Sequence, residues 1–139
     1  MIPNKDVGWI VGVFFSSTKA NLCVNYGEVI GDTEVGGIIG QYYQENITDS
    51  HNYGTISGNA NTAGLFGTLY ASSSATNSYN YKNVTSIDQV ADIAGYLNGT
   101  LTNCDNFGSI TATNNDATLF GPIYGNLNGG TATNCDDFS

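Results

Sequence analysis

Positive charge is scarce in this sequence. Its 139 residues include no arginine, three lysines and one histidine against 12 acidic residues, which gives a formal net charge of −9. Proteins that bind nucleic acids use a basic surface to release counterions from the phosphates, and Lys5, Lys19 and Lys82 are too few to form one. An anionic membrane surface repels an acidic chain for the same reason. The charge balance therefore excludes nucleic-acid binding.

Long apolar runs and good helix formers are also missing. The richest apolar stretch, 7–15, has about half of the roughly 20 residues that span a bilayer, so we expect no membrane insertion. Only 11% of residues are charged, while glycine occurs 18 times and Asn, Ser and Thr are abundant. These residues disfavour helices, and the apolar residues are mostly strand formers. Because 40% of the chain is hydrophobic, it is too apolar for disorder, and we predict an all-β protein.

Two short motifs recur together along the chain. The first ends in glycine and occurs five times, as Val7-Gly-Trp-Ile-Val-Gly12, Val35-Gly-Gly-Ile-Ile-Gly40, Thr62-Ala-Gly-Leu-Phe-Gly67, Val90-Ala-Asp-Ile-Ala-Gly95 and Asp116-Ala-Thr-Leu-Phe-Gly121. The second places an aromatic residue after Asn or Asp, at Asn25-Tyr26, Asn52-Tyr53, Asn80-Tyr81, Asn106-Phe107 and Asp137-Phe138. The period of about 27 residues predicts one β-solenoid domain, 1–139, of about five coils of 26–31 residues: roughly 7–34, 35–61, 62–89, 90–115 and 116–139.

The spacing between the two motifs differs on the two sides of each coil. Fourteen positions separate each motif aromatic from the next motif glycine, as from Phe107 to Gly121, whereas the return distance ranges from 12 to 17 positions. Coils of a solenoid stack through backbone hydrogen bonds at roughly 4.8 Å, which requires equal lengths. We therefore predict that the constant arc forms the strands and that the variable arc is a loop on one edge.

Equivalent positions form columns of like residues. Three columns are predicted to point inward: Ile10, Ile38, Leu65, Ile93 and Leu119; Phe14, Tyr42, Leu69, Leu97 and Ile123; and Val29, Ile56, Val84 and Ile110. A column of small residues, which a narrow corner requires, contains Gly8, Gly36, Ala63, Ala91 and Ala117. The Asn25, Asn52, Asn80 and Asn106 column, continued by Asp137, predicts a side-chain ladder that satisfies backbone groups of the turns.

The motifs Gly37-Ile-Ile-Gly40 and Gly64-Leu-Phe-Gly67, each followed by Asn-Tyr, resemble the GLUG-motif repeat found in tandem in large bacterial surface and secreted proteins, including adhesin-like proteins. The resemblance covers nearly the whole chain. It departs at Asp92 and Thr118, which replace the first motif glycine, and at Lys82, which replaces the later one. It implies an extracellular or cell-surface module and no activity, because the repeats of IgA-peptidase-type proteins are not their catalytic part.

Residues for catalysis and metal binding are sparse. His51 is the one histidine, and Asp105 and Asp136 are interpreted as exposed turn acids rather than as a glycosidase pair, so we predict no enzyme. Three cysteines, Cys23, Cys104 and Cys135, share one column with Ser50 and Ser78, which indicates packed free thiols rather than a metal site. No cofactor is expected, although Asp32 and Asp116 leave calcium as an open alternative.

The first candidate binding surface is an aromatic stripe three positions after the motif glycines. It consists of Phe15, Tyr43, Tyr70 and Tyr124, with Asn98 in the fourth coil. Aromatic side chains beside loops of variable length are typical of surfaces that recognise a glycan or a protein. The alternative is an aromatic column that only stabilises the stacking of the coils.

A second candidate surface follows the variable loop. Its hydroxyl-bearing residues include Thr48, Thr76, Thr100, Thr102, Thr131 and Thr133, in Thr-x-Thr rows with an apolar residue between. Such rows on a flat β-solenoid face resemble the ice-binding surfaces of several antifreeze proteins. Threonine in an exposed strand is also ordinary, and the first coil has Asn21 in this column.

Together these features predict a non-enzymatic extracellular module for adhesion, ligand binding or spacing, with a glycan or a host or neighbour-cell protein as partner. Ice binding is the alternative, and a self-assembling filament subunit is the second alternative. We expect the chain to be a segment of a longer repeat protein, because Phe138 and Ser139 stop inside a repeat without a polar capping coil. Further coils or subunits are then expected to cover the C-terminal end.

Overall fold

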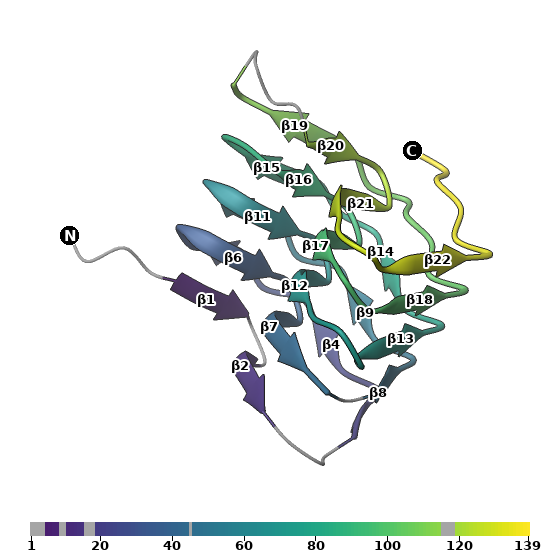
Figure 1. Cartoon of the computed structure of the whole chain (residues 1–139). Coiled ribbons are helices and arrows are strands. Elements are labelled where there is room, and N and C mark those ends of the chain that lie inside the picture. Colours follow the sequence, from purple (N-terminus) through teal and green to yellow (C-terminus); the bar gives the residue numbers. More distant parts are fainter. Residues whose placement is uncertain (1–4, 9–10, 16–18, 45, 115–118) are drawn as a thin grey trace.

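The computed structural model describes residues 5–8, 11–15, 19–44, 46–114 and 119–139, and of residues 5–7, 11 and 13–15 it describes the backbone alone. The described residues contain 22 short strands and no helix. All strand pairs are parallel, and each strand pairs with the equivalent strand of the next coil. Figure 1 shows the result, coils stacked from β1 and β2 at the lower left of the view to β19 and β20 near the top. The predicted all-β β-solenoid is confirmed.

The strands form five faces, here named A to E in chain order, with five strands each in faces A to C, three in face D and four in face E. Face A contains β1 (Lys5–Gly8), β6 (Thr33–Gly36), β11 (Ala60–Ala63), β16 (Val90–Ala91) and β20 (Phe120–Gly121); face B contains β2 (Val11–Phe15), β7 (Ile39–Tyr43), β12 (Phe66–Leu69), β17 (Ala94–Leu97) and β21 (Tyr124–Leu127). Face C contains β3 (Ala20–Asn21), β8 (Asn46–Thr48), β13 (Ser74–Thr76), β18 (Thr100–Thr102) and β22 (Thr131–Thr133). Face D contains β4 (Val24–Asn25), β9 (His51–Asn52) and β14 (Tyr79–Asn80), continued by bridges at Asn106 and Asp137; face E contains β5 (Val29–Ile30), β10 (Ile56–Gly58), β15 (Val84–Ser86) and β19 (Ile110–Ala112). The chain crosses face A first at β1 and for the fifth time at β20, so about four full turns lie between these two strands.

The strands are short because left-handed residues bend the chain at fixed points of each coil. Between faces C and D this position is filled by Leu22, Asp49, Asn77, Asn103 and Asn134, with φ between 50° and 56°. Asn and Asp tolerate this conformation better than other residues with a Cβ atom, because their short polar side chains hydrogen-bond locally. The Thr-x-Thr-Asn sequence thus encodes a strand followed by a corner.

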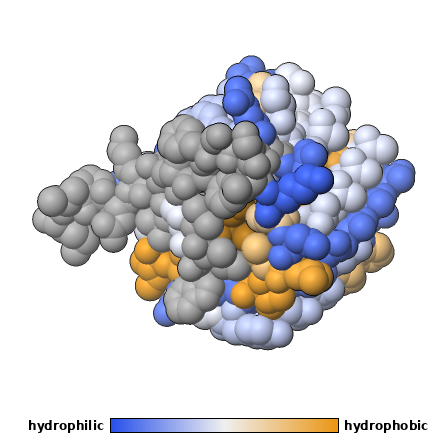
Figure 2. Space-filling model, turned by 90° about the horizontal axis from the view of Figure 1, so that it is seen from below, coloured by the Kyte–Doolittle hydropathy of each residue, from blue (hydrophilic) through white to orange (hydrophobic). Residues whose placement is uncertain are grey.

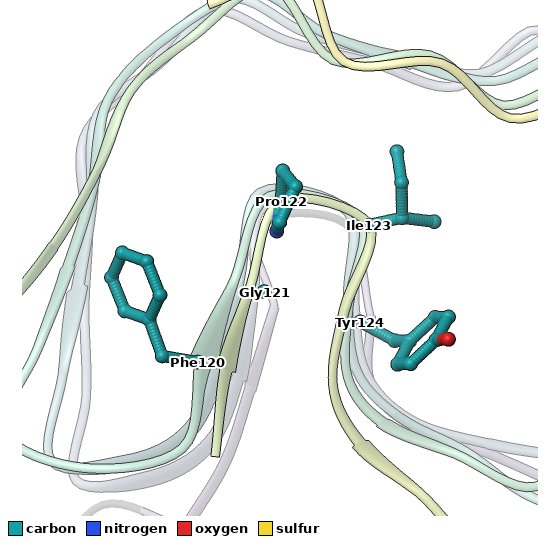
Figure 3. A pocket seen from close by; sticks show the side chains of 5 residues that line it. All are labelled: Phe120, Gly121, Pro122, Ile123 and Tyr124. Atoms are coloured by element: carbon teal, nitrogen blue, oxygen red, sulfur yellow. The ribbon is translucent and has the colours of Figure 1, made fainter. Parts of the chain in front are cut away.

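The corner between faces A and B points into the molecule and divides its interior. Figure 3 shows it in the last coil, with Gly121 and Pro122 at the tip, Phe120 on one side, and Ile123 and Tyr124 on the other. Two hydrophobic cores result. The first includes Ile38, Leu65, Leu69, Ile93, Leu97 and Leu101, and the second consists of Val29, Val35, Ile56, Val84 and Val90. The inward columns predicted from the sequence lie in these cores with one exception, Leu119, which is half-buried and belongs to neither core. Ile10 and the Phe14 side chain lie outside the description.

The predicted register of the fifth coil is wrong. Gly121 pairs with Ala91, and Tyr124 pairs with Ala94, so Gly125 rather than Gly121 is equivalent to Gly95. The fifth copy of the glycine motif is therefore the stretch 120–125, not 116–121. The small-residue column ends at Gly121 instead of Ala117, which lies outside the described residues. Likewise Ile123 belongs to the column of Ile93, and Leu127 to that of Leu97.

The cause of the shift is a longer connection between faces E and A in the last coil. Ala112 pairs with Ser86, and Phe120 pairs with Val90. Seven residues separate Ala112 from Phe120, whereas three separate Ser86 from Val90 in the coil below, a difference of four. The arc predicted to be constant is thus longer here. The predicted variable loop joins faces B and C, where the connection shortens from Leu69–Ser74 to Leu97–Thr100.

We predict that a large side chain at the inward corner destabilises the fold. Ala63 and Ala91 are fully buried there, so Ala63→Leu or Ala91→Leu should lower the free energy of unfolding by roughly 1–3 kcal/mol or more through overpacking. Urea titration followed by circular dichroism measures this change. The control is Ala71→Leu in an exposed loop, and equal stabilities of the three variants would contradict the corner assignment.

Candidate functional site

The structure brings together only part of the predicted aromatic stripe. Tyr43 and Tyr70 stack with ring centroids 4.1 Å apart and an interplanar angle of 10°. Their hydrogen bond, together with burial, raises the pKa of Tyr70. The equivalent residue in the next coil is Asn98, which ends the stack, and the backbone of Phe15 pairs with Tyr43 while its side chain is outside the description.

Tyr124 does not belong to the stripe. Because of the register shift, it pairs with Ala94 and packs against the first hydrophobic core. The prediction that it lines up with Tyr43 and Tyr70 is therefore wrong. Among the described side chains, the stripe retains the Tyr43–Tyr70 pair, whose Tyr43 hydroxyl donates to Oε1 of Gln41 at 3.1 Å and whose Tyr70 ring makes a tilted contact with Tyr96 at 6.2 Å.

A longer row of rings lies on face D, at the motif aromatics that mark the repeat. This aromatic ladder consists of Tyr26, Tyr53, Tyr81, Phe107 and Phe138. Successive ring centroids are 5.2, 4.6, 5.1 and 5.1 Å apart, and interplanar angles lie between 2° and 12°. The two end rings are the most exposed, with 76% of Tyr26 and 60% of Phe138 accessible to solvent.

A second column of rings borders the ladder. His51 stacks on Tyr79 at 5.2 Å, and tilted contacts of 6.2 to 6.4 Å join this pair to Tyr53 and Tyr81. The two columns form one continuous surface of seven rings, here called the aromatic face. Asp105 and Asp136 continue the His51 column toward the C-terminus and make that part of the face acidic.

The geometry of the aromatic face determines what it offers to a ligand. Inner rings of a stack expose edges and hydroxyl groups, whereas the outer sides of Tyr26 and Phe138 expose whole ring surfaces. Burial, followed by the neighbouring Tyr53, raises the pKa of Tyr81, and burial with the Asp105 charge raises that of Tyr79. Both phenols therefore remain protonated at neutral pH and can donate hydrogen bonds.

The sequence contained a signal for this face. Alternation along a strand places the residue after an inward Asn on the outside, so an inward asparagine column implies an outward aromatic column. The binding surfaces predicted from the sequence do not include these aromatics.

The predicted threonine face is present on face C. Its outward columns are in register across neighbouring coils, as Ser74, Thr100 and Thr131, and as Thr76, Thr102 and Thr133. Between the columns, Ile47, Ala75 and Leu101 point inward and are fully buried. Some hydroxyls bond within the face: Thr48 donates to Oδ1 of Asn21 at 2.7 Å, and Ser74 donates to Oδ1 of Asn46 at 2.5 Å.

The asparagine ladder is buried at the centre of the molecule. Each Nδ2 donates to the side-chain oxygen of the next coil, from Asn25 to Asn52 (2.7 Å), Asn52 to Asn80 (2.8 Å), Asn80 to Asn106 (3.1 Å) and Asn106 to Asp137 (2.7 Å). Each amide also bonds the backbone two residues on, as Asn52 does with the N–H and C=O of Gly54. The predicted ladder, which satisfies turn backbone groups between coils, is confirmed.

The tip of the inward corner touches this ladder. A Cβ atom at Gly37 would lie 2.7 Å from Oδ1 of Asn52, and one at Gly64 would lie 2.4 Å from Oδ1 of Asn80. Glycine is therefore required at these two positions. The fourth coil has Asp92 at this point, fully buried, with Oδ1 accepting a hydrogen bond from Nδ2 of Asn80 at 3.0 Å. Desolvation, reinforced by the Asp137 charge, raises the pKa of Asp92 to about 8.

The three cysteines occupy one column beside the corner of faces C and D, with free thiols. The Cys104 backbone N–H donates to Sγ of Cys135 at 3.4 Å, as Ser50 N–H donates to Oγ of Ser78 at 3.2 Å. The thiol–thiol hydrogen bond raises the pKa of Cys104, and it lowers that of Cys135 to about 7. Cysteine and serine thus play the same packing role in this column.

The described residues hold no group of three or more His, Cys, Asp and Glu side chains arranged to bind a metal ion. Asp32 accepts a hydrogen bond from Asn59, whereas Asp116 lies outside the described residues. Across the described ranges, no helix is long and apolar enough to cross a membrane.

Comparisons with protein-family models, with curated proteins and with solved structures find no match to this chain.

We predict that Asp92 makes the fold less stable as the pH rises. The folded state holds this carboxyl neutral up to a pKa of about 8, whereas the unfolded chain ionises near the ordinary value of 3.8. The free energy of unfolding should therefore fall between about pH 4 and pH 8, by at most about 1.4 kcal/mol per pH unit. Asp92→Asn should remove this slope and be the more stable protein at pH 8.

Urea titrations at pH 5 and pH 8 measure the effect of Asp92. The control is Asp136→Asn, which removes an exposed carboxylate and should keep the slope of the parent protein. Parallel pH profiles for Asp92→Asn and the parent would contradict the assignment.

Proposed function

We propose that this chain is a non-enzymatic module of an extracellular or cell-surface protein and that it binds its ligand through the aromatic face. One observation carries the proposal: seven stacked or tilted rings form a continuous surface on a scaffold whose own core lies elsewhere, and four of them, Tyr26, Tyr53, Phe107 and Phe138, are exposed. Exposed aromatic surface of this extent is typical of interaction sites, because Tyr and Phe bury much apolar area at little cost in side-chain entropy.

The scaffold favours binding without rearrangement. The asparagine ladder and the parallel backbone pairing fix the spacing of the rings at the 4.6 to 5.2 Å of the stack. A preorganised surface loses less conformational entropy on association than a mobile one. Hydroxyl groups of Tyr26, Tyr53 and Tyr81 follow the same axis, so a long, repeating ligand can take successive hydrogen bonds along it.

The ligand class that fits is a glycan or an extended segment of a neighbouring cell's protein. Both present hydroxyl or amide groups next to apolar surface, which the edges and hydroxyls of the ladder can meet. The resemblance to the GLUG-motif repeat supports a surface or secreted location. The acidic net charge disfavours anionic glycans, so neutral or cationic ones are preferred.

A glycan and protein array tests the aromatic face. We expect the parent chain to be captured and the double variant Tyr53→Leu with Tyr81→Leu to lose capture at least about tenfold, because leucine keeps apolar packing but removes ring and hydroxyl. The matched control is Tyr43→Leu with Tyr70→Leu on the predicted stripe, which should be captured like the parent.

Circular dichroism and melting curves verify that both double variants fold. Loss of capture in the control alone would move the site to the tyrosine pair of face B. A parent chain that no array feature captures would argue for a spacer role instead.

Ice binding through the threonine face is a second proposal, favoured by the in-register hydroxyl columns over a buried apolar row. Neighbouring hydroxyls repeat at roughly 4.8 Å along the axis and about 6.7 Å along each strand. If this surface orders water, Thr76→Tyr should abolish thermal hysteresis, since the bulky ring breaks its flatness. Thr85→Tyr, outward on face E, should leave it intact. Hysteresis absent from the parent chain would eliminate this function.

A further inference from the structure

The ring column that borders the aromatic ladder stops inside the solenoid. His51 stacks on one side of Tyr79, with ring centroids 5.2 Å apart and an interplanar angle of 7°. In the next coil the equivalent position is Asp105, because Asn80 and Asn106, each one residue further on, form a parallel bridge. The second side of Tyr79 therefore faces a carboxylate where a third ring would continue the stack.

The aromatic ladder beside this column continues without a break. Tyr81 and Phe107 stack with ring centroids 5.1 Å apart, and Tyr81 makes a tilted contact of 6.4 Å with Tyr79. Among the described side chains, Tyr79 contacts the rings of His51 and Tyr81 and no third ring. Because an aspartate side chain is much shorter than a tyrosine, Asp105 can cover only the inner part of the Tyr79 ring.

Negative charge lies next to the uncovered part of this ring. Burial is the main cause of the raised pKa of Tyr79 and of Tyr81, and the Asp105 charge adds to it at both phenols, so the carboxylate lies near both. Oδ1 of Asp105 accepts a hydrogen bond from the backbone N–H of Asp136 at 3.1 Å. A carboxylate has about four lone-pair positions, so Asp105 can accept further donors.

A guanidinium group fits a half-covered ring beside a carboxylate. It is planar, it stacks on aromatic rings, and it meets a carboxylate with two parallel N–H donors. Stacked on Tyr79, it lies in the layer of Asp105, because successive coils are separated by roughly 4.8 Å. A lysine ammonium is compact and strongly hydrated and lacks this planar fork. The chain itself contains no arginine, so the guanidinium has to come from another molecule.

We propose that Tyr79 and Asp105 bind an arginine side chain from an extended segment of a partner protein, with the guanidinium stacked on the ring and its N–H groups donating to the carboxylate. The rest of the segment lies against the aromatic ladder. This inference rests on the proposed function of the aromatic face and narrows its ligand to a protein segment that contains arginine.

The charge and surface of the molecule suit such a segment. The net charge of −9 attracts a basic partner over long range and repels an acidic one. Figure 2, a view from the side of the first coil, shows that blue to white residues make up most of the described surface on that side. A polar, charged segment therefore matches this molecule better than an apolar one.

Fluorescence anisotropy with short capped peptides tests the inference on the full chain. The peptides alternate serine with arginine, with lysine or with citrulline, which keeps the planar shape of arginine but carries no charge. We expect the arginine peptide to bind at least about tenfold more tightly than either of the others. Equal binding of the arginine and lysine peptides would reduce the effect to net charge and overturn the proposal. So would a chitosan oligomer that displaces the arginine peptide at a lower concentration than unlabelled peptide does.

Two substitutions of Asp105 locate the site. Asp105→Asn keeps the size of the side chain and removes its charge, and it should weaken binding of the arginine peptide at least about tenfold. Asp105→Phe supplies the missing ring, as Phe107 does in the ladder, and should abolish the preference for arginine over citrulline. The matched control is Asp32→Asn, between faces E and A, which loses the same charge and should bind like the parent.

Melting curves verify that the three variants fold. An Asp105→Phe variant that binds the arginine peptide like the parent, or an Asp32→Asn variant that loses as much as Asp105→Asn, would overturn the assignment of the site.

Failure of this inference differs from failure of the proposed function. A parent chain that the array captures through Tyr53 and Tyr81, but that binds the three peptides equally, would overturn the arginine site and leave the binding function standing. A parent chain that binds neither an array feature nor any peptide would overturn both.

Discussion

The buried asparagine ladder is the interaction on which the rest of this fold depends. Its amides join neighbouring coils to one another and also bond the backbone of the turns two residues on. The inward corner can approach the opposite wall only because glycine or a hydrogen-bonding residue meets the ladder there. A buried amide with a missing partner is costly, so the ladder holds every coil at one register. That register aligns the aromatic and threonine faces.

The sequence predicted most of the fold because stacking converts a period of about 27 residues directly into columns in space. The columns of Ile38 and Ile56 were placed correctly for this reason. The last coil was placed wrongly because Leu-Phe-Gly at 119–121 and Ile-Tyr-Gly at 123–125 have the same pattern of an apolar residue, an aromatic residue and glycine. Only the backbone pairing with the fourth coil shows which of these two stretches is equivalent to Ile93-Ala94-Gly95. The small-residue column predicted a narrow corner but not its contact with the asparagine ladder, since glycines indicate a close approach without identifying its partner.

The candidate site was predicted less well than the fold. Residues one position apart on a strand face opposite sides, so Tyr26 and Tyr53 could have been assigned to the surface from the inward Asn25 and Asn52. The stripe through Tyr43 depended on counting from the motif glycine, and this count failed at Tyr124. Depth of burial, which separates a packed ring from an exposed one, depends on neighbouring coils and on the inward corner, and neither is encoded in a local pattern.

Hydrogen bonds in this solenoid run along its axis, in the backbone and in the asparagine ladder alike, which has a mechanical consequence. A force that pulls the first and last coils apart acts on the hydrogen bonds between every pair of neighbouring coils. The most weakly bonded coil therefore detaches first, and the others remain folded. Each detached coil of about 27 residues releases roughly 90 Å of extended chain. Under tension the solenoid should therefore lengthen in steps of this size, one coil at a time, and not in a single event.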